Sequence, residues 1–140
     1  MIPNNLSFLI VDDFDAVQHM VKTQLTSLGF KGPFHYASSG KQATQIIQEM
    51  IEMNKPIQFI ISDLVMPNGD GLDLLKKVRE IKEHKNTPFV MLTSQDDRDS
   101  VMKALEAGAS NYLIKPWSQQ SLSEKIAYCW EKHFGTKATK

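Results

Sequence analysis

Acidic side chains follow short apolar runs of this sequence, at the points where buried strands are expected to end. Asp12 and Asp13 come directly after Phe8–Val11, and Asp63 comes after the apolar run 59–61 and one serine. Carboxylates held close together raise one another's pKa and need a cation. An all-oxygen acidic cluster suits Mg²⁺, which accepts carboxylate and phosphate oxygens and keeps several waters. The three aspartates therefore predict a magnesium site, in which one carboxylate can become an aspartyl-phosphate.

Hydroxyl and ammonium groups follow two further apolar runs. Thr93 and Ser94 come after the run 89–92, and Lys115 comes after the run 112–114. A lysine would attract the oxygens of an incoming phosphoryl group, and a threonine would offer a hydroxyl donor. Each residue alone has a plainer interpretation, because a strand-end aspartate is usually a turn or helix cap. Together, at the ends of four strands, the three aspartates, the threonine and the lysine indicate one site for phosphoryl chemistry.

Strands that alternate with helices would position these residues. The runs that predict strands are Phe8–Val11, Phe34–Ala37, 59–61, 89–92 and 112–114. Several are apolar without interruption, which is typical of strands buried on both faces of a parallel sheet. Apolar residues at helical spacing lie between and after them, over 17–28, 43–51, 72–81, 101–105 and 122–134. The pattern predicts an α/β fold, a (βα)5 doubly wound sheet of five parallel strands, which binds ligands at the carboxyl ends of its strands.

One helix start has two candidate caps. Ser121-x-x-Glu124 is a capping-box pattern, and Ser118 could cap the last helix instead. The length of 140 residues predicts one domain, with residues 1–134 folded and residues 135–140 a frayed tail.

Composition and charge exclude several classes of protein. Lysine plus arginine and aspartate plus glutamate each number 16, so the basic excess of a nucleic-acid-binding protein is missing. The single cysteine, Cys129, suits a reducing compartment. The start of the chain lacks the features of a signal peptide, and no apolar run is long enough to span a membrane. We therefore expect a cytoplasmic protein that neither binds nucleic acid nor inserts into a membrane.

Several short motifs carry a family resemblance. They are Asp12-Asp13, Asp63-Leu64-Val65-Met66-Pro67, Asp70-Gly71, Thr93-Ser94 and Lys115-Pro116. By these motifs the sequence resembles, over essentially its whole length, the receiver domain of response regulators in two-component signalling. Within that family it resembles the single-domain, CheY-like chemotaxis regulators. The resemblance implies a flavodoxin-like fold with the strand order 2-1-3-4-5 that is known for this family.

The resemblance implies roles for the acidic residues. Asp63 would accept a phosphoryl group from a phosphohistidine on a histidine kinase or a phosphotransfer protein. Asp13 and Asp63 would bind Mg²⁺ directly, together with the backbone carbonyl of Val65, and Asp12 would hold a metal-bound water. The domain would phosphorylate and dephosphorylate itself as a switch, and would not be a turnover enzyme.

The resemblance also implies how phosphorylation would change the surface. Lys115 would contact the phosphoryl group, and Thr93, with its neighbour Ser94, would move toward it. Tyr112 would then move inward. The charge added by phosphorylation would in this way shift Thr93 and Tyr112 from one of two arrangements to the other. The Lys115–Pro116 bond would be cis, although only about 5–6% of X-Pro bonds in folded proteins are cis.

An output face is implied on the fourth helix, fifth strand and last helix. Its residues are Asp96, Asp97, Arg98, Tyr112, Lys125 and Tyr128. This face would bind a downstream protein in chemotaxis- or motility-type signalling, and the protein would be a monomer. Asp96 and Tyr128 differ from the residues that CheY-like regulators offer the flagellar motor, which argues against that target.

Val65 departs from the family pattern, which has a polar residue two places after the phosphoacceptor. An apolar side chain there cannot orient the water that hydrolyses an acyl phosphate. We therefore expect slower self-dephosphorylation than in a variant with asparagine at this position.

Three alternative functions remain open at this point. Asp13-Phe14-Asp15-Ala16-Val17 fits the D-x-D-x-[TV] pattern of haloacid-dehalogenase-like phosphatases, with Asp13 as nucleophile and Asp15 as acid/base. That hypothesis leaves Asp63 unexplained and needs a further acidic pair after Lys115. A receiver fold that no longer takes phosphate is a second alternative. A phosphate sink that competes for a shared kinase is the third.

Overall fold

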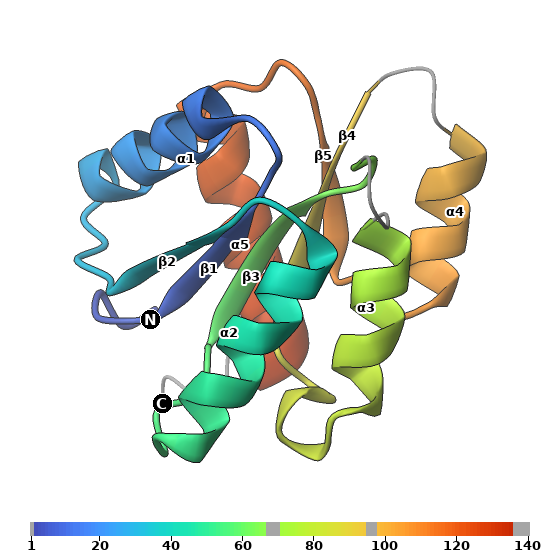
Figure 1. Ribbon diagram of the computed structural model, residues 1–140. Helices are drawn as coiled ribbons and strands as arrows, with labels where there is room; N and C mark the ends of the chain where they lie inside the picture. The colour runs from blue at the N-terminus through green and yellow to red at the C-terminus, as the bar shows by residue number, and fades with distance from the viewer. Residues whose placement is uncertain (1, 67–70, 95–97, 136–140) are drawn as a thin grey trace.

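The computed structural model describes residues 2–66, 71–94 and 98–135, which form a parallel sheet covered by helices on both faces (Figure 1). In chain order the elements are β1 (Phe8–Val11), α1 (Asp15–Ser27), β2 (Phe34–Ala37), α2 (Gly40–Glu52), β3 (Phe59–Asp63), α3 (Gly71–Glu80), the 3₁₀ turn η1 (Lys82–His84), β4 (Phe89–Thr93), α4 (Arg98–Glu106), β5 (Asn111–Ile114) and α5 (Gln119–Phe134). The predicted strands and helices are confirmed, and η1 is an addition.

The five strands are all parallel and lie in the order β2-β1-β3-β4-β5, as the family resemblance implied. Val11 pairs with Ser62, which brings the next residues, Asp12 and Asp63, to the same level at the carboxyl end of the sheet. Thr93 pairs with Ile114, so Lys115 begins the loop directly beyond that pair. The register of the sheet therefore aligns the polar residues that the sequence singled out.

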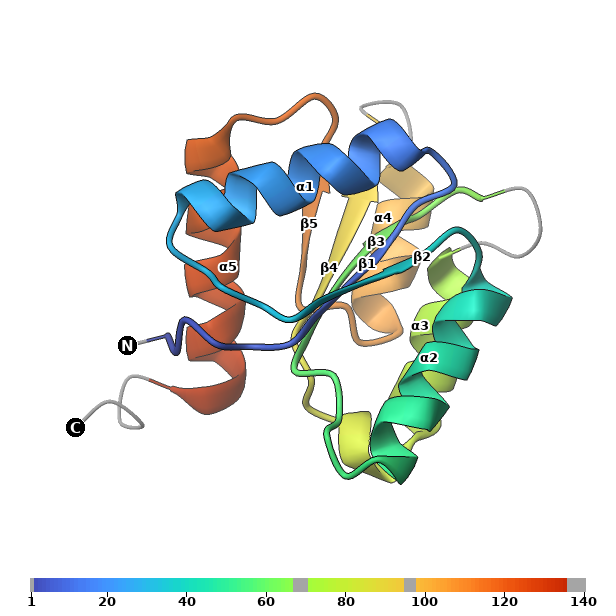
Figure 2. The same ribbon diagram turned by 60° about the vertical axis from the view of Figure 1, so that its left-hand side comes forward.

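Apolar side chains of the strands point alternately into two cores. Leu9 and Val11 pack with buried residues of α2, α3 and α4, whereas Phe8 and Ile10 pack with those of α1 and α5. The two helical layers lie on opposite faces of the sheet in both views (Figure 1, Figure 2). All residues of β1, β3 and β4 are buried, which explains why their sequences are apolar without alternation.

Local interactions fix where two helices begin or end. Ser118 is the N-cap of α5, because its hydroxyl accepts a hydrogen bond from the Ser121 N–H at 3.0 Å. The capping box at Ser121 is therefore wrong, and the alternative cap is confirmed. Gly29 follows the end of α1 with a φ of +100°, a conformation that glycine adopts without steric cost.

Two X-Pro bonds are cis. One is Lys115–Pro116, as the resemblance implied, and the other is Gly32–Pro33, which nothing in the sequence indicated. In the part of the chain that the structure describes, no helix is long and apolar enough to cross a membrane. The expected tail beyond residue 134 stays a prediction, since all of it except Gly135 lies outside the described residues.

Candidate functional site

Three carboxylates meet at the carboxyl ends of β1 and β3. Asp12, Asp13 and Asp63 each place one oxygen within 4.8 Å of the others. Asp12 and Asp63 are buried, and Asp13 is half-buried. Oxygen ligands of this kind are those that hard divalent cations take in proteins, so the donor set fits Mg²⁺.

Lys115 supplies the positive charge of this cluster. Its Nζ lies 3.3 Å from Asp63 Oδ1 and 3.5 Å from Asp12 Oδ2, and it reaches them from the loop after β5. Backbone groups contribute as well, because the Phe14 N–H donates to Asp12 Oδ1 at 2.9 Å and the Val65 N–H approaches Asp63 Oδ1 at 3.4 Å. Among the described residues, Lys115 is the one cation that contacts Asp12 and Asp63, and with Asp13 nearby the cluster holds more carboxylates than cations.

Burial dominates the ionisation of this site. Loss of solvent raises the pKa of Asp63, while Lys115 opposes the rise and the charge of Asp13 adds to it. Desolvation likewise raises the pKa of Asp12, with Asp63 adding to the rise and the Phe14 N–H and Lys115 opposing it. A bound divalent cation would relieve the repulsion that Lys115 leaves uncompensated.

The residues of the predicted switch come from β4, from the residue that follows it and from β5. Thr93 is buried at the end of β4, and its hydroxyl donates to the Ser94 carbonyl at 3.3 Å. Ser94 is exposed. Tyr112 is half-buried in β5, with Lys125 Nζ 4.9 Å from its ring centroid. The structure therefore places Thr93 and Tyr112 on neighbouring strands, and their roles stay predictions.

The predicted output face is described only in part. Asp96 and Asp97 lie outside the described residues, and Arg98 is the exposed first residue of α4. Lys125 donates a hydrogen bond to Asn111 Oδ1 at 3.2 Å, and Tyr128 is 53% exposed on α5. Exposed apolar residues of α4 and β5 that sequence reasoning missed as members of this face are Met102 and Ile114.

Gly71 is required by the close packing of the start of α3 against the end of β3. A Cβ at this position would lie 2.2 Å from the backbone oxygen of Asp63 and 3.0 Å from Cα of Leu64. The Gly71 N–H also donates to the Leu64 carbonyl at 2.8 Å, which fastens the start of α3 to the end of β3. The motif Asp70-Gly71 therefore has a steric reason at its second position.

Sequence reasoning missed a buried amide, Gln18. It lies on the same face of α1 as Val21 and Leu25, three and seven residues further on. That helical spacing was a usable signal, because it places a polar side chain on a face that packs against the sheet. Gln24 also makes a distant contact, since the Trp117 Nε1–H donates to its Oε1 at 2.7 Å.

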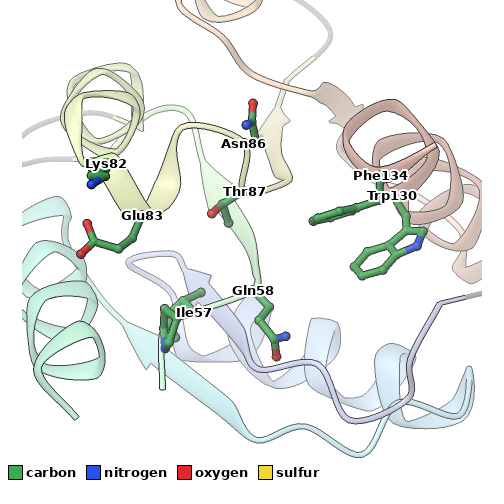
Figure 3. Close-up of a pocket in the computed structure, with 9 residues that line it drawn as sticks. Ile57, Gln58, Lys82, Glu83, Asn86, Thr87, Trp130 and Phe134 are labelled. Atoms are coloured by element: carbon green, nitrogen blue, oxygen red, sulfur yellow. The ribbon is translucent and has the colours of Figure 1, made fainter. Parts of the chain in front are cut away.

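A pocket of about 300 Å³ lies at the opposite end of the sheet, where β3 and β4 begin (Figure 3). Trp130 and Phe134 of α5 lie on one side, Lys82 and Glu83 of η1 lie across from them, and Gln58 lies between the two groups. The acidic cluster lies at the carboxyl end of the sheet, beyond β1 and β3. This pocket is therefore separate from the candidate site.

The doubly wound parallel sheet carries carboxylates, a threonine and a lysine at the carboxyl ends of its strands, which is where open α/β sheets bind ligands. The family is shown directly by sequence: the chain belongs to the response regulator receiver domain family, whose pattern matches residues 8–127. The haloacid-dehalogenase-like alternative has no comparable support, because its second aspartate, Asp15, is exposed on α1 and outside the carboxylate cluster.

Chemotaxis proteins are among its relatives. The chain is 32% identical to chemotaxis protein CheY-3 of Vibrio cholerae over 132 residues, 94% of this chain and 97% of the relative. It is 34% identical to a CheY homolog of Campylobacter jejuni over 121 residues, 86% of this chain and 89% of the relative. Among solved structures, a response regulator receiver domain protein from Clostridium thermocellum superposes with a TM-score of 0.78 at 28% identity, covering 91% and 95% of the two chains.

Replacement of Gly71 by alanine tests the steric account. We expect Gly71→Ala to lower the free energy of unfolding in urea by about 1–3 kcal/mol, the usual range for an overpacked site that must shift. Gly29→Ala is the matched control, because its Cβ would meet nothing within 4 Å and only the positive φ would be strained. A Gly71→Ala protein as stable as the wild type would contradict the contact with the Asp63 carbonyl.

Neutralisation of Asp63 tests the charge balance. Because the folded state raises the pKa of Asp63 above its ordinary 3.8, the protonated carboxyl favours folding, and this contribution is lost as pH rises through the raised value. We expect metal-free Asp63→Asn to melt at a higher temperature than the wild type at pH 7, with the gap narrowing toward pH 4.

Two additions make this measurement specific. Glu49→Gln, at an exposed position of α2, should change stability by less than about 0.5 kcal/mol and serves as the control. Mg²⁺ at ten times its dissociation constant should stabilise the wild type by about 1.4 kcal/mol and stabilise Asp63→Asn less. Equal pH profiles for the wild type and Asp63→Asn would show that the folded state does not raise the pKa of Asp63.

Proposed function

We propose that this receiver domain accepts a phosphoryl group on Asp63 from a phosphohistidine of a histidine kinase or phosphotransfer protein, in a Mg²⁺-dependent reaction. The observation that carries the proposal is the ammonium of Lys115, 3.3 Å from Asp63 Oδ1 and 3.5 Å from Asp12 Oδ2, beside the three-carboxylate cluster. Membership of the receiver family and the similarity to chemotaxis proteins agree with it.

The acidic residues would divide the work at this site. Asp12, Asp13 and Asp63 would hold Mg²⁺, joined by the backbone carbonyl of Val65. Bound there, the ion would offset the charge of the carboxylates and of the phosphoryl oxygens. Asp63 is held by Lys115 and the Val65 N–H, which orient one carboxylate oxygen before the donor arrives.

The transfer itself is a displacement at phosphorus. A carboxylate oxygen of Asp63 forms a bond to the phosphorus while the P–N bond to the donor imidazole breaks, and the imidazole nitrogen keeps the electron pair. Lys115 attracts the phosphoryl oxygens as they pass between donor and acceptor. The carboxylate must be ionised to attack, and the ammonium of Lys115 keeps its pKa from rising further.

Phosphorylation of Asp63 would change the protein surface through residues of β4 and β5. Among the described residues, the only hydrogen bond of the Thr93 hydroxyl is a long one of 3.3 Å to the Ser94 carbonyl, so the hydroxyl would turn toward a phosphoryl group at small cost. Tyr112 would then move inward from its half-buried position and change the surface of α4, β5 and α5. We propose that a downstream protein of chemotaxis- or motility-type signalling binds this surface, and that the protein acts as a cytoplasmic monomer.

Direct phosphorylation tests the proposal. The protein is incubated with acetyl phosphate, with and without Mg²⁺, and its intact mass is recorded alongside Asp63→Ala. We expect a single phosphate adduct that requires Mg²⁺ and is absent from the variant, because the carboxylate of Asp63 is the nucleophile. An adduct that survives Asp63→Ala would move the nucleophile to Asp13, and no adduct on the wild type would leave a receiver fold without phosphoryl chemistry.

The lifetime of the phosphorylated form gives a second test. The Val65 side chain is 64% exposed and offers no hydrogen-bonding group to a water that attacks the acyl phosphate. We expect Val65→Asn to shorten the half-life several-fold, since an amide can orient that water. Val65→Leu is the matched control and should leave the half-life unchanged, as it changes shape without adding a polar group. Equal half-lives for the asparagine variant and the wild type would refute the role of position 65.

A further inference from the structure

One buried side chain next to the acidic cluster has no part in the chemistry described so far. Gln18 lies in the first turns of α1 and is 8% exposed. Its Nε2 donates hydrogen bonds to the backbone carbonyl of Asp12 at 2.8 Å and to that of Ala37 at 3.1 Å. A single side-chain amide therefore joins the ends of β1 and β2 to the helix above them.

Every polar atom of Asp12 has a partner as a result. Its N–H donates to the Ala37 carbonyl at 3.0 Å, and its own carbonyl accepts from Gln18. Its two carboxylate oxygens contact the Phe14 N–H and Lys115 Nζ, at 2.9 and 3.5 Å. The carbonyl bond is the one member of this set that comes from a side chain of α1.

The carbonyl of Asp12 belongs to the peptide that connects Asp12 to Asp13. This peptide lies just beyond the β1–β2 pairing, whose last pair is Val11 with Ala37, so the strand ladder no longer orients it. A peptide is planar, and a bond that fixes its carbonyl also fixes its N–H and the direction in which the next residue leaves. The Gln18 amide thus holds the peptide from which Asp13 departs.

We propose that Gln18 is a positioning residue that holds the Asp12–Asp13 peptide so that both carboxylates face one Mg²⁺. This inference rests on the proposed function, because it concerns the same metal site. Glutamine suits the task, since its amide supplies two donor hydrogens and adds no charge beside three carboxylates. An apolar residue of similar size would leave the buried Asp12 carbonyl without this partner.

The rest of α1 is anchored well enough to serve as a fixed support. Val21 and Leu25 are fully buried in the core between α1, α5 and the sheet. Near its end, Gln24 accepts the indole N–H of Trp117, two residues after Lys115. The amide of Gln18 therefore acts from a helix whose position is set by independent contacts.

Replacement of Gln18 by methionine tests the inference, because it keeps the length and removes the donors. Mg²⁺ affinity is measured by calorimetric titration of the wild type, Gln18→Met and Val21→Ala. Val21→Ala is the matched control, since it destabilises the same buried face of α1 without touching the Asp12 carbonyl. We expect Gln18→Met to weaken Mg²⁺ binding about tenfold or more, as loss of groups that orient metal ligands does, and Val21→Ala to leave it within about twofold.

A second readout follows the peptide itself without any metal. The amide nitrogen of Asp13 should change its NMR chemical shift in Gln18→Met and keep it in Val21→Ala, because the hydrogen bond lost is on the carbonyl of the same peptide. Gln18→Asn, whose amide is one methylene shorter, replaces Gln18→Met if the latter does not fold.

The outcomes separate the two proposals. Wild-type Mg²⁺ affinity in Gln18→Met, or an unmoved Asp13 amide, overturns the positioning role and leaves the proposed function intact. Absence of Mg²⁺ binding in the wild type itself overturns the proposed function, and the role of Gln18 at the metal site falls with it.

Discussion

The gathering of three carboxylates at one buried edge of the sheet is the constraint on which the candidate site of this protein depends. The register of β1 with β3 brings Asp12 and Asp63 to the same level, so the backbone cannot separate them without breaking the sheet. Burial of both groups strengthens the repulsion, because little water remains to screen it. Lys115 offers one cation near three carboxylates, so an excess of acidic groups remains at this edge of the sheet, where the proposed Mg²⁺ would bind.

Much of the fold could be predicted from the sequence because its central strands are buried on both faces. Such strands leave uninterrupted apolar runs, and the alternation with helices leaves few possible topologies. The polar residues Asp12, Asp63 and Lys115 could be assigned to one edge for the same reason, since parallel strands end on the same side. Family resemblance then added the strand order and the cis bond before Pro116.

The remaining features depend on contacts between distant segments. Gln18 was overlooked because its partners are backbone carbonyls, which every residue has and no sequence pattern marks. The choice of Ser118 over Ser121 as helix cap depends on the path of the loop after β5, and both serines fit the local pattern. Gly71 was recognisable as part of a motif. The steric reason for a glycine at this position is the nearby Asp63 carbonyl, which is visible only in the structure.

The strand order has a consequence for how the chain is made. The strand of this sheet that is synthesised first, β1, lies inside the finished sheet between β2 and β3. A nascent chain that has reached Asp63 already contains all three carboxylates, yet the codon for Lys115 is still several seconds away at about 5–20 residues per second. The three carboxylates of the candidate site are thus synthesised well before Lys115. A chain cut short ahead of β5 would carry that uncompensated charge together with an open edge on β4, which is the kind of species that chaperones and proteases remove.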